Sequence, residues 1–417
     1  MAGSDAREAK MEQMKQWVFL VTFVNYAMAH WTRKAYTNVK SQMGETGVST
    51  YTLALMDSMF MFTYAGGSFI TGMLGDNCGA ATVIAIGLLG SSGVLLMIWA
   101  GLIGGDDSIA ASGAISLVWF ASAQFIHGFF QATGGPVNTA IMNSWWPKKG
   151  RGKIFGFWTC HQYIGDIVAA FAGAYILSSG MDWRNAIMIP LVINFAWSLV
   201  NFYFLANSPE EVPELVESTA ETTSLSTEEK TVAEDEDKPP SFMDAMKVAW
   251  NYALAFGFFK LINYAMFFQL PTILSANFDS STANIISSLY SVGMMPGGIV
   301  CGWMSDIYGG KRACVCATMM VILIPLLVMF AFFMDDLDVY VLLFTLCLMG
   351  CLVGGPNNII TSAVSSDLAD TLGKKATGTV TGIINGSGSV TAAFGQMAIP
   401  ILFEMGKADG VNYRYVW

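Results

Sequence analysis

The chain has 417 residues, of which 54% are hydrophobic and 12% are charged. Average soluble domains carry about 25% charged residues, so this composition is typical of a protein embedded in a membrane. The formal net charge is −10, and residues 207–240 alone hold eleven acidic residues and two lysines, a net charge of −9. The remainder is nearly neutral, which excludes nucleic acid as a partner.

Apolar runs recur along the whole chain, and each is long enough to cross a lipid bilayer as a helix. Residues 1–15 are polar, and the first apolar run exceeds the hydrophobic region of a signal peptide, which predicts an uncleaved first span. The expected spans are residues 16–37, 50–73, 80–103, 114–142, 152–178, 185–206, 246–273, 281–304, 312–333, 338–365 and 376–403. The sequence therefore predicts an all-α membrane protein with eleven spans present, in contact with the lipid bilayer.

A segment rich in Glu, Ser, Thr and Pro follows the sixth span. Residues 207–243 cannot bury a hydrophobic core, so we expect a disordered acidic linker there. The linker separates an N-terminal bundle of six spans, residues 1–206, from a C-terminal bundle, residues 244–417, with five spans.

Short motifs recur in both halves of the chain. Residues 72–76 (Gly-Met-Leu-Gly-Asp) return 230 residues later as 302–306 (Gly-Trp-Met-Ser-Asp), and residues 134–136 (Gly-Gly-Pro) return as 354–356. A duplicated array of spans is typical of transporters, because two halves can rock about a binding site between them.

The same spacing predicts that the last span of the second half is missing. Trp183 and Arg184 open the sixth span, and their counterparts 230 residues later are Tyr413 and Arg414. These would open a twelfth span, whereas the sequence stops at Trp417. We therefore expect the C-terminal bundle to be truncated before its last helix.

Basic residues indicate the orientation in the membrane, because short loops rich in Lys and Arg face the cytosol. Alternate short loops are basic, which places the N-terminus and the acidic linker in the cytosol. The sequence fits both the endoplasmic reticulum and the plasma membrane, and it does not indicate an oligomeric state. The basic loops carry Lys148, Lys149, Arg151, Lys153, Lys311, Arg312, Lys374 and Lys375, and the opposite loops carry Asp106, Asp107, Asp335, Asp336 and Asp338.

Two glycine–aspartate turns join spans two and three and spans eight and nine. Glycines let helices approach closely, and the aspartate can cap a helix N-terminus or pair with an arginine. A basic pair follows the second turn, whereas two alanines follow the first. Two copies at matched positions resemble the signature of the major facilitator superfamily. We interpret the turns as conformational latches formed by Gly72, Asp76, Gly302, Asp306 and Arg312.

Charged or titratable side chains within the spans point to a substrate site, since a charge at a helix centre costs roughly 2.5–3.5 kcal/mol. They are Arg33, His161, Asp166 and Lys260. The repeat spacing maps Arg33 onto Asn263, and Lys260 lies one turn earlier on the same helix face. Two cations from pseudo-symmetric helices would face one cavity and suit a dianionic group such as phosphate, which an arginine can bind through two oxygens.

Structural roles are the alternative for these residues. Arg33 and Lys34 lie late in span one and could extend to the outer headgroups. His161 could pack between helices, and Asp166 could pair with a serine or a backbone group. Lys260 lies deeper in its span, where extension to the headgroups explains it less well.

Enzyme chemistry is not expected. The three histidines are well separated in sequence and form no metal-binding cluster, and no phosphate-binding Walker loop is present. We therefore expect no enzymatic activity, no metal and no cofactor.

Several longer segments resemble the sugar-phosphate exchangers, eukaryotic solute carriers related to the glucose-6-phosphate transporter and to bacterial glycerol-3-phosphate antiporters. The matching segments are residues 33–34, 128–136, 145–161, 259–271, 355–368 and 374–382, so the resemblance covers nearly the whole chain. It implies a major facilitator fold of two pseudo-symmetric six-helix bundles and phosphate-linked antiport. It places the span-one arginine and the span-five histidine of phosphate-binding relatives on Arg33 and His161, and the lysine of the eukaryotic branch on Lys260.

Three positions depart from the pattern of this family. Ser68 stands where bacterial relatives have a lysine in span two, and Asn263 stands where they have a second cation. Asp166 replaces a family asparagine and adds a carboxylate near the proposed site. These departures leave the identity of the sugar phosphate and the role of protons open.

Together these observations predict a secondary active antiporter that exchanges a phosphorylated small metabolite, of the sugar phosphate or glycerol 3-phosphate type, for inorganic phosphate by alternating access. One alternative is a major facilitator transporter of another small anion, such as a monocarboxylate or nitrate. Another is a membrane sensor that binds phosphate compounds without transporting them. The substrate-binding candidates are Arg33, Lys34, His161, Asp166, Lys260, Asn263 and Tyr264.

Overall fold

The computed structural model describes residues 2–215, 241–274, 277–278, 280–334, 337–372 and 376–408. Every regular element in these residues is helical, which confirms the all-α prediction. The chain divides into two compact units. Unit 1 comprises Met1–Pro147, Ile164–Ala249 and Ser366–Gly386, and unit 2 comprises Lys148–Tyr163, Trp250–Ser365 and Ser387–Trp417.

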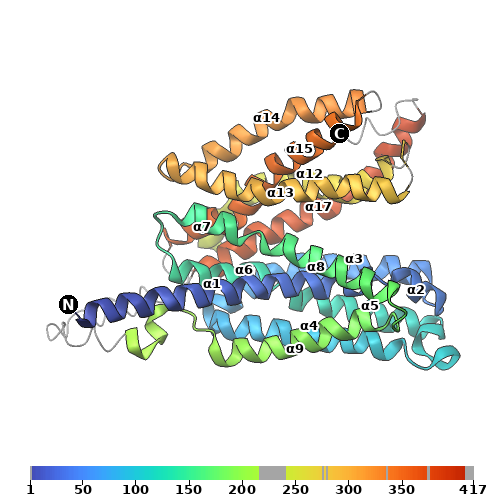
Figure 1. The fold of residues 1–417 in the computed structure, drawn as a ribbon, viewed down its shortest axis with the longest axis horizontal. Coiled ribbons are helices and arrows are strands. Elements are labelled where there is room, and N and C mark those ends of the chain that lie inside the picture. The colour runs from blue at the N-terminus through green and yellow to red at the C-terminus, as the bar shows by residue number, and fades with distance from the viewer. Residues whose placement is uncertain are drawn as a thin grey trace. The chain divides into compact units, whose positions relative to one another are not determined.

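Unit 1 holds most helices of the N-terminal half (Figure 1). They are α1 (Ala2–Thr37), α2 (Lys40–Glu45), α3 (Thr50–Cys78), α4 (Ala80–Gly101), α5 (Ala114–Gln131), α6 (Gly134–Trp145), α9 (Asn185–Phe204), most of α8 (His161–Ser178) and most of α16 (Ser365–Ala369). The short 3-10 turns η1 (Gly105–Asp107) and η2 (Ile109–Ala111) lie between α4 and α5, and η3 (Pro209–Glu211) follows α9.

Unit 2 contains α7 (Arg151–Trp158), most of α12 (Phe242–Leu274), α13 (Ser280–Ile307), α14 (Arg312–Phe333), α15 (Val339–Ile359) and the π-helical turn η5 (Ile360–Val364). The long α17 (Thr377–Ala408) begins in unit 1 and continues in unit 2 from Ser387. Each unit therefore combines three separate segments of the chain that contact one another. The division into bundles at 1–206 and 244–417 stays a prediction.

The predicted spans fall on these helices. Span 114–142 is divided between α5 and α6, and span 152–178 is divided between α7 and α8. Among the described residues, five helices are long and apolar enough to cross a membrane: Tyr51–Cys78, Ala80–Gly101, Asn185–Phe204, Arg312–Phe333 and Val339–Ala369. The total of eleven spans stays a prediction.

Two predicted features lie partly or wholly outside the described residues. They are residues 216–240, the larger part of the acidic linker, and residues 409–417, where a twelfth span would open. Before the first gap, the Asn207 amide donates to Glu211 Oε1 at 2.7 Å, and its oxygen accepts a 2.7 Å bond from the Ala81 backbone nitrogen. The chain is thus tied to unit 1 as far as η3.

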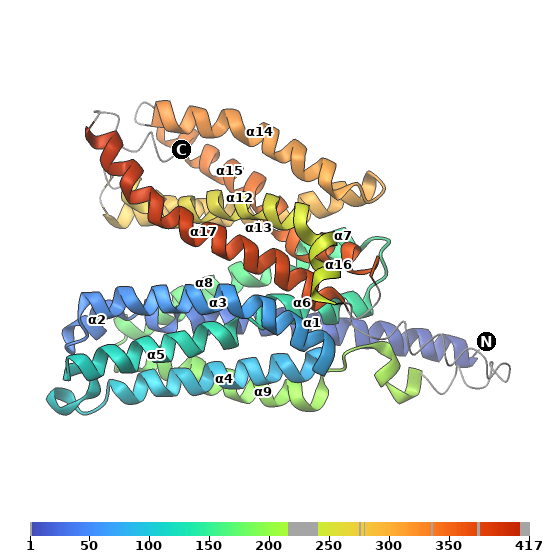
Figure 2. The same ribbon diagram turned by 180° about the vertical axis from the view of Figure 1, so that it is seen from behind.

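The core of unit 1 is formed by apolar side chains of α1, α4, α5 and α9. Leu95, Ile98 and Phe120 are completely buried there. Helices α4 and α9 lie side by side in both views (Figures 1 and 2), and the Asn194 amide of α9 donates to Leu88 O of α4 at 2.6 Å. Interhelical hydrogen bonds of this kind hold helices together where lipid removes the hydrophobic driving force.

Glycines allow α13 and α15 of unit 2 to pack closely. A Cβ atom at Gly293 would lie 2.0 Å from the Cys347 carbonyl oxygen, and one at Gly350 would lie 2.0 Å from the Tyr290 carbonyl oxygen. Because no side chain fits in that space, small residues let the two backbones touch.

Candidate functional site

Arg33 lies on α1 between two aromatic rings of α3. Its guanidinium carbon is 5.3 Å from the Phe60 ring centroid and 4.8 Å from that of Tyr64. A cation at these distances is attracted by the negative face of each ring. The two rings therefore orient the guanidinium.

Lys34 and Asp166 meet at the contact between α1 and α8. The Lys34 ammonium is 3.7 Å from Asp166 Oδ1, and His30 Nδ1 is 3.1 Å from the same oxygen. The helices are close at this level, because a Cβ atom at Gly165 would lie 2.4 Å from the Ala27 carbonyl oxygen. Asp166 thus pairs with two side chains of α1, which differs from the structural alternative of a serine or backbone partner.

His30 is a residue that the sequence analysis missed. It is 9% exposed, and its ring lies 5.0 Å from the Tyr26 ring. Residues three and four apart share one face of a helix, so the spacing of His30, Arg33 and Lys34 already indicated a common cluster. With Asp166 these three side chains form what we call the α1–α8 charge cluster.

A second buried histidine, His127, lies behind Phe60. Its ring is 5.5 Å from the Phe60 ring, and its nitrogens lie 3.1 Å from Gln124 Oε1 and 3.2 Å from Gln131 Nε2. The Gln131 amide also donates to the Thr32 hydroxyl of α1 at 2.8 Å. This network, which the sequence analysis did not predict, supports α1 next to Arg33.

Lys260 of α12 is 6% exposed within unit 2. Its ammonium donates to the Ser389 hydroxyl of α17 at 2.7 Å and lies 5.6 Å from the rings of both Phe256 and Tyr264. Tyr264 is thus a direct neighbour of Lys260. Ser389 is a further polar group that the sequence analysis missed.

Asn263 and His161 make separate contacts in unit 2. Asn263 Oδ1 accepts a 3.2 Å hydrogen bond from the Tyr290 hydroxyl of α13. His161 is 3% exposed, and its ring stands edge-on to Trp158 at 4.5 Å. The aromatic contact fits the packing role that we considered as the alternative for His161.

The predicted substrate residues therefore form one group in each unit. Arg33, Lys34 and Asp166 lie together in unit 1, and Lys260 and Tyr264 lie together in unit 2, with Asn263 on the same helix. The joint action of the two groups on one anion stays a prediction.

The first glycine–aspartate turn contacts the start of α17 within unit 1. Asp76 accepts hydrogen bonds from Gly378 N at 2.9 Å, Thr379 N at 2.6 Å and the Thr379 hydroxyl at 2.6 Å. A Cβ atom at Gly72 would lie 2.2 Å from the Gly378 carbonyl oxygen. The carboxylate thus caps a helix N-terminus, where negative charge is stabilised.

The second turn repeats this arrangement within unit 2. Asp306 accepts from Gly152 N at 3.2 Å and Lys153 N at 2.7 Å, at the start of α7. Arg312 Nη1 lies 3.3 Å from Asp306 Oδ1, and a Cβ atom at Gly302 would lie 2.1 Å from the Gly152 carbonyl oxygen. Each turn therefore holds a helix that lies far away in the sequence.

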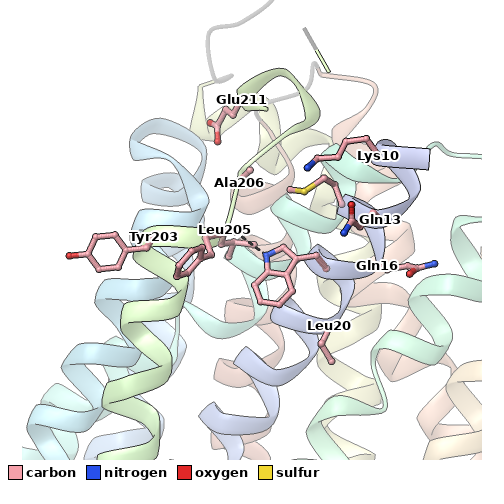
Figure 3. A pocket seen from close by; sticks show the side chains of 11 residues that line it. Lys10, Gln13, Gln16, Leu20, Tyr203, Leu205, Ala206 and Glu211 are labelled. Atoms are coloured by element: carbon pink, nitrogen blue, oxygen red, sulfur yellow. Dashed lines mark hydrogen bonds between the residues drawn. The ribbon is translucent and has the colours of Figure 1, made fainter. Parts of the chain in front are cut away.

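A pocket of about 730 Å³ opens in unit 1, away from the predicted substrate residues (Figure 3). The N-terminal half of α1 contributes Lys10, Gln13 and Gln16, and the end of α9 contributes Tyr203. The Trp17 indole donates to the Phe204 carbonyl at 3.0 Å beside it. None of the predicted substrate-binding residues lines this pocket.

Comparison with known proteins finds one matching family and similar relatives in animals and plants. The family described as Major Facilitator Superfamily matches residues 18–396. Sugar phosphate exchanger 3 of Mus musculus is 30% identical, with coverage of 96% of this chain and 88% of the relative. Putative glycerol-3-phosphate transporter 1 of Arabidopsis thaliana is 31% identical, with coverage of 94% and 83%.

Solved structures support the same fold. The proton:xylose symporter XylE, in complex with 6-bromo-6-deoxy-D-glucose, superposes with a TM-score of 0.70 at 13% identity, covering 97% of this chain and 93% of that chain. At this low identity the likeness concerns the fold alone.

Proposed function

Because the chain belongs to the major facilitator superfamily and, within it, to the sugar-phosphate exchanger family, we propose that it exchanges a phosphorylated small metabolite for inorganic phosphate. The chain is an integral multi-pass membrane protein by its family and its apolar helices. The substrate is of the sugar phosphate or glycerol 3-phosphate type that the names of the relatives state.

The observation that carries this proposal is a cationic side chain beside aromatic rings in each unit, with Lys260 also bonded to a hydroxyl. Arg33 lies against the rings of Phe60 and Tyr64, and Lys260 lies against Ser389 and Tyr264. A charge removed from water is costly unless an opposite charge offsets it. A phosphate group between the two cations would offset both, with two oxygens on the guanidinium and one on the ammonium.

Exchange rather than one-way transport follows from the same electrostatics. An empty site with both cations resists closure, because two like charges would be desolvated together. A bound phosphate lowers this desolvation cost, so the two halves move between the two access states only when the site holds a ligand. The gradients of the two exchanged anions then drive transport.

The capped aspartates supply the conformational part of the mechanism. Asp76 holds the start of α17, and Asp306 holds the start of α7. We propose that these caps belong to one of the two access states and break in the other. In this mechanism the N-terminus and the acidic linker face the cytosol, and the membrane is that of the endoplasmic reticulum or the cell surface.

Uptake by reconstituted vesicles tests the proposal. Labelled glucose 6-phosphate and glycerol 3-phosphate are offered to vesicles that contain inorganic phosphate and to vesicles that contain none. We expect rapid uptake only with internal phosphate. Equal uptake into both refutes exchange, uptake of nitrate or lactate instead supports a transporter of another anion, and binding without uptake supports a sensor.

A further inference from the structure

The α1–α8 charge cluster contains more titratable groups than phosphate binding requires. The imidazole of His30 and the carboxylate of Asp166 are 3.1 Å apart, and the ammonium of Lys34 is 3.7 Å from the same carboxylate oxygen. Arg33 lies three residues after His30 on α1, on the same face of the helix. The group of positive side chains that we expect to bind an anionic substrate therefore also contains a carboxylate and a histidine.

The charged and titratable groups near this pair lie on four helices of unit 1. Helices α6 and α9 present the neutral amides of Asn138 and Asn201 to Asn25. The titratable and charged groups are Tyr26, Arg33 and Lys34 of α1, Asp166 of α8, Tyr64 of α3 beside Arg33, and His127 of α5. Of the two histidines, only His30 contacts a carboxylate among the described residues.

We propose that His30 and Asp166 bind a proton together with the substrate, so that unit 1 matches its charge to that of the phosphate group. Histidine is the side chain whose charge changes between pH 5 and 8. The Asp166 carboxylate lies 3.1 Å from the imidazole nitrogen, so it can accept a hydrogen bond from the protonated ring. The proton therefore resides on the imidazole. This inference rests on the proposed function.

The formal charge of the cluster determines which ionic form of the substrate it binds. With a neutral imidazole the cluster of Arg33, Lys34 and Asp166 has a formal charge of +1, and with a protonated His30 the charge is +2. The second ionisation of a phosphate monoester falls near pH 6, so the dianion predominates at neutral pH. Protonation of His30 adds one positive charge, which favours binding of the dianion over the monoanion. Dianion binding is thus accompanied by uptake of one proton.

Equilibrium binding of labelled glucose 6-phosphate to the purified full chain tests this inference without transport. Between pH 6.5 and 8 the probe is mostly the dianion, and we expect its affinity to fall roughly tenfold as the cluster loses one charge. A pH indicator in weakly buffered solution should report close to one proton taken up per molecule bound at pH 7. In His30→Gln both the pH dependence and the proton uptake should disappear.

Two further variants keep the test decisive if His30→Gln folds poorly. Asp166→Asn removes the carboxylate, and the pH dependence should move to lower pH because the imidazolium loses its partner. His127→Gln is the matched control, since the ring nitrogens of this buried histidine contact the amides of Gln124 and Gln131, and it should keep the pH profile of the wild type. Size-exclusion chromatography shows which variants are folded.

The outcomes separate this inference from the proposed function. An unchanged pH profile and unchanged proton uptake in His30→Gln, or an equal loss in His127→Gln, would overturn the proton site and leave exchange intact. pH-dependent binding through His30 without vesicle exchange would support the proton site and refute exchange. No binding of either glucose 6-phosphate or glycerol 3-phosphate to the wild type at any pH would overturn both.

Discussion

Lys260 of α12 donates a 2.7 Å hydrogen bond to the hydroxyl of Ser389 on α17 within unit 2. The rings of Phe256 and Tyr264 lie 5.6 Å from the same ammonium. The hydroxyl and the two rings therefore hold the ammonium in a defined position. Under the proposed function Ser389 is therefore a positioning residue for a phosphate ligand.

Substitution of Ser389 by alanine should weaken substrate binding while leaving transport measurable. A hydrogen bond to a charged group contributes about 1.5–3 kcal/mol, so we expect KM for glucose 6-phosphate to rise roughly tenfold or more. Ser387→Ala is the matched control, because residues two apart on a helix point in different directions. A KM that rises equally in both variants would contradict the positioning role.

Arg33→Ala should abolish phosphate-dependent exchange in a protein that still folds. Arg33→Lys keeps the charge and loses the planar fork, so it should retain partial activity with a higher KM. Lys247→Ala serves as the control, because the Lys247 side chain is 71% exposed and forms a surface ion pair with Asp244. Full exchange by Arg33→Ala would remove Arg33 from the site.

Much of the fold was predictable from the sequence because it depends on hydrophobic runs and duplicated motifs. Apolar runs decide where helices form in a membrane protein, and residues 302–306 repeat residues 72–76 closely enough to identify the family. The breaks at 132–133 and 159–160 were not predicted, since an apolar run continues through both. A helix break there depends on packing against other helices, which the sequence does not display.

The candidate site was predictable where a charge interrupts an apolar run. Arg33, Lys260 and Asp166 stand out for that reason. Ser389 did not, because a serine in a helix is unremarkable until an ammonium is placed 2.7 Å away. His30 escaped notice because its importance comes from Asp166, 136 residues away in sequence.

The aspartate caps should affect turnover more than binding. Asp76→Asn and Asp306→Asn keep the shape and remove the charge that accepts hydrogen bonds from the starts of α17 and α7. Charge at a helix N-terminus contributes roughly 0.3–2 kcal/mol, so the maximal exchange rate should fall several-fold with little change in KM. Asp106→Asn, on exposed η1, should leave the rate unchanged.

Rates measured with saturating glucose 6-phosphate in phosphate-loaded vesicles check this prediction. If the two cap variants raise KM and keep the maximal rate, the caps take part in binding and their role as conformational latches is wrong.

Close packing at Gly302 gives a prediction about stability that is independent of the substrate. A Cβ atom there would lie 2.1 Å from the Gly152 carbonyl oxygen, which is backbone and cannot rotate away. Gly302→Ala should therefore separate α13 from α7 and lower the unfolding temperature in detergent. Overpacking of this kind costs about 1–3 kcal/mol.

Gly93 provides the opposite case on α4. It is exposed, and a Cβ atom there would meet nothing within 4 Å. Alanine favours a helix over glycine by about 1 kcal/mol, so Gly93→Ala should keep or raise the unfolding temperature. Thermal unfolding of both variants compares them directly. If Gly302→Ala is as stable as Gly93→Ala, the helices have room at the turn, and the close approach of α7 to α13 is wrong.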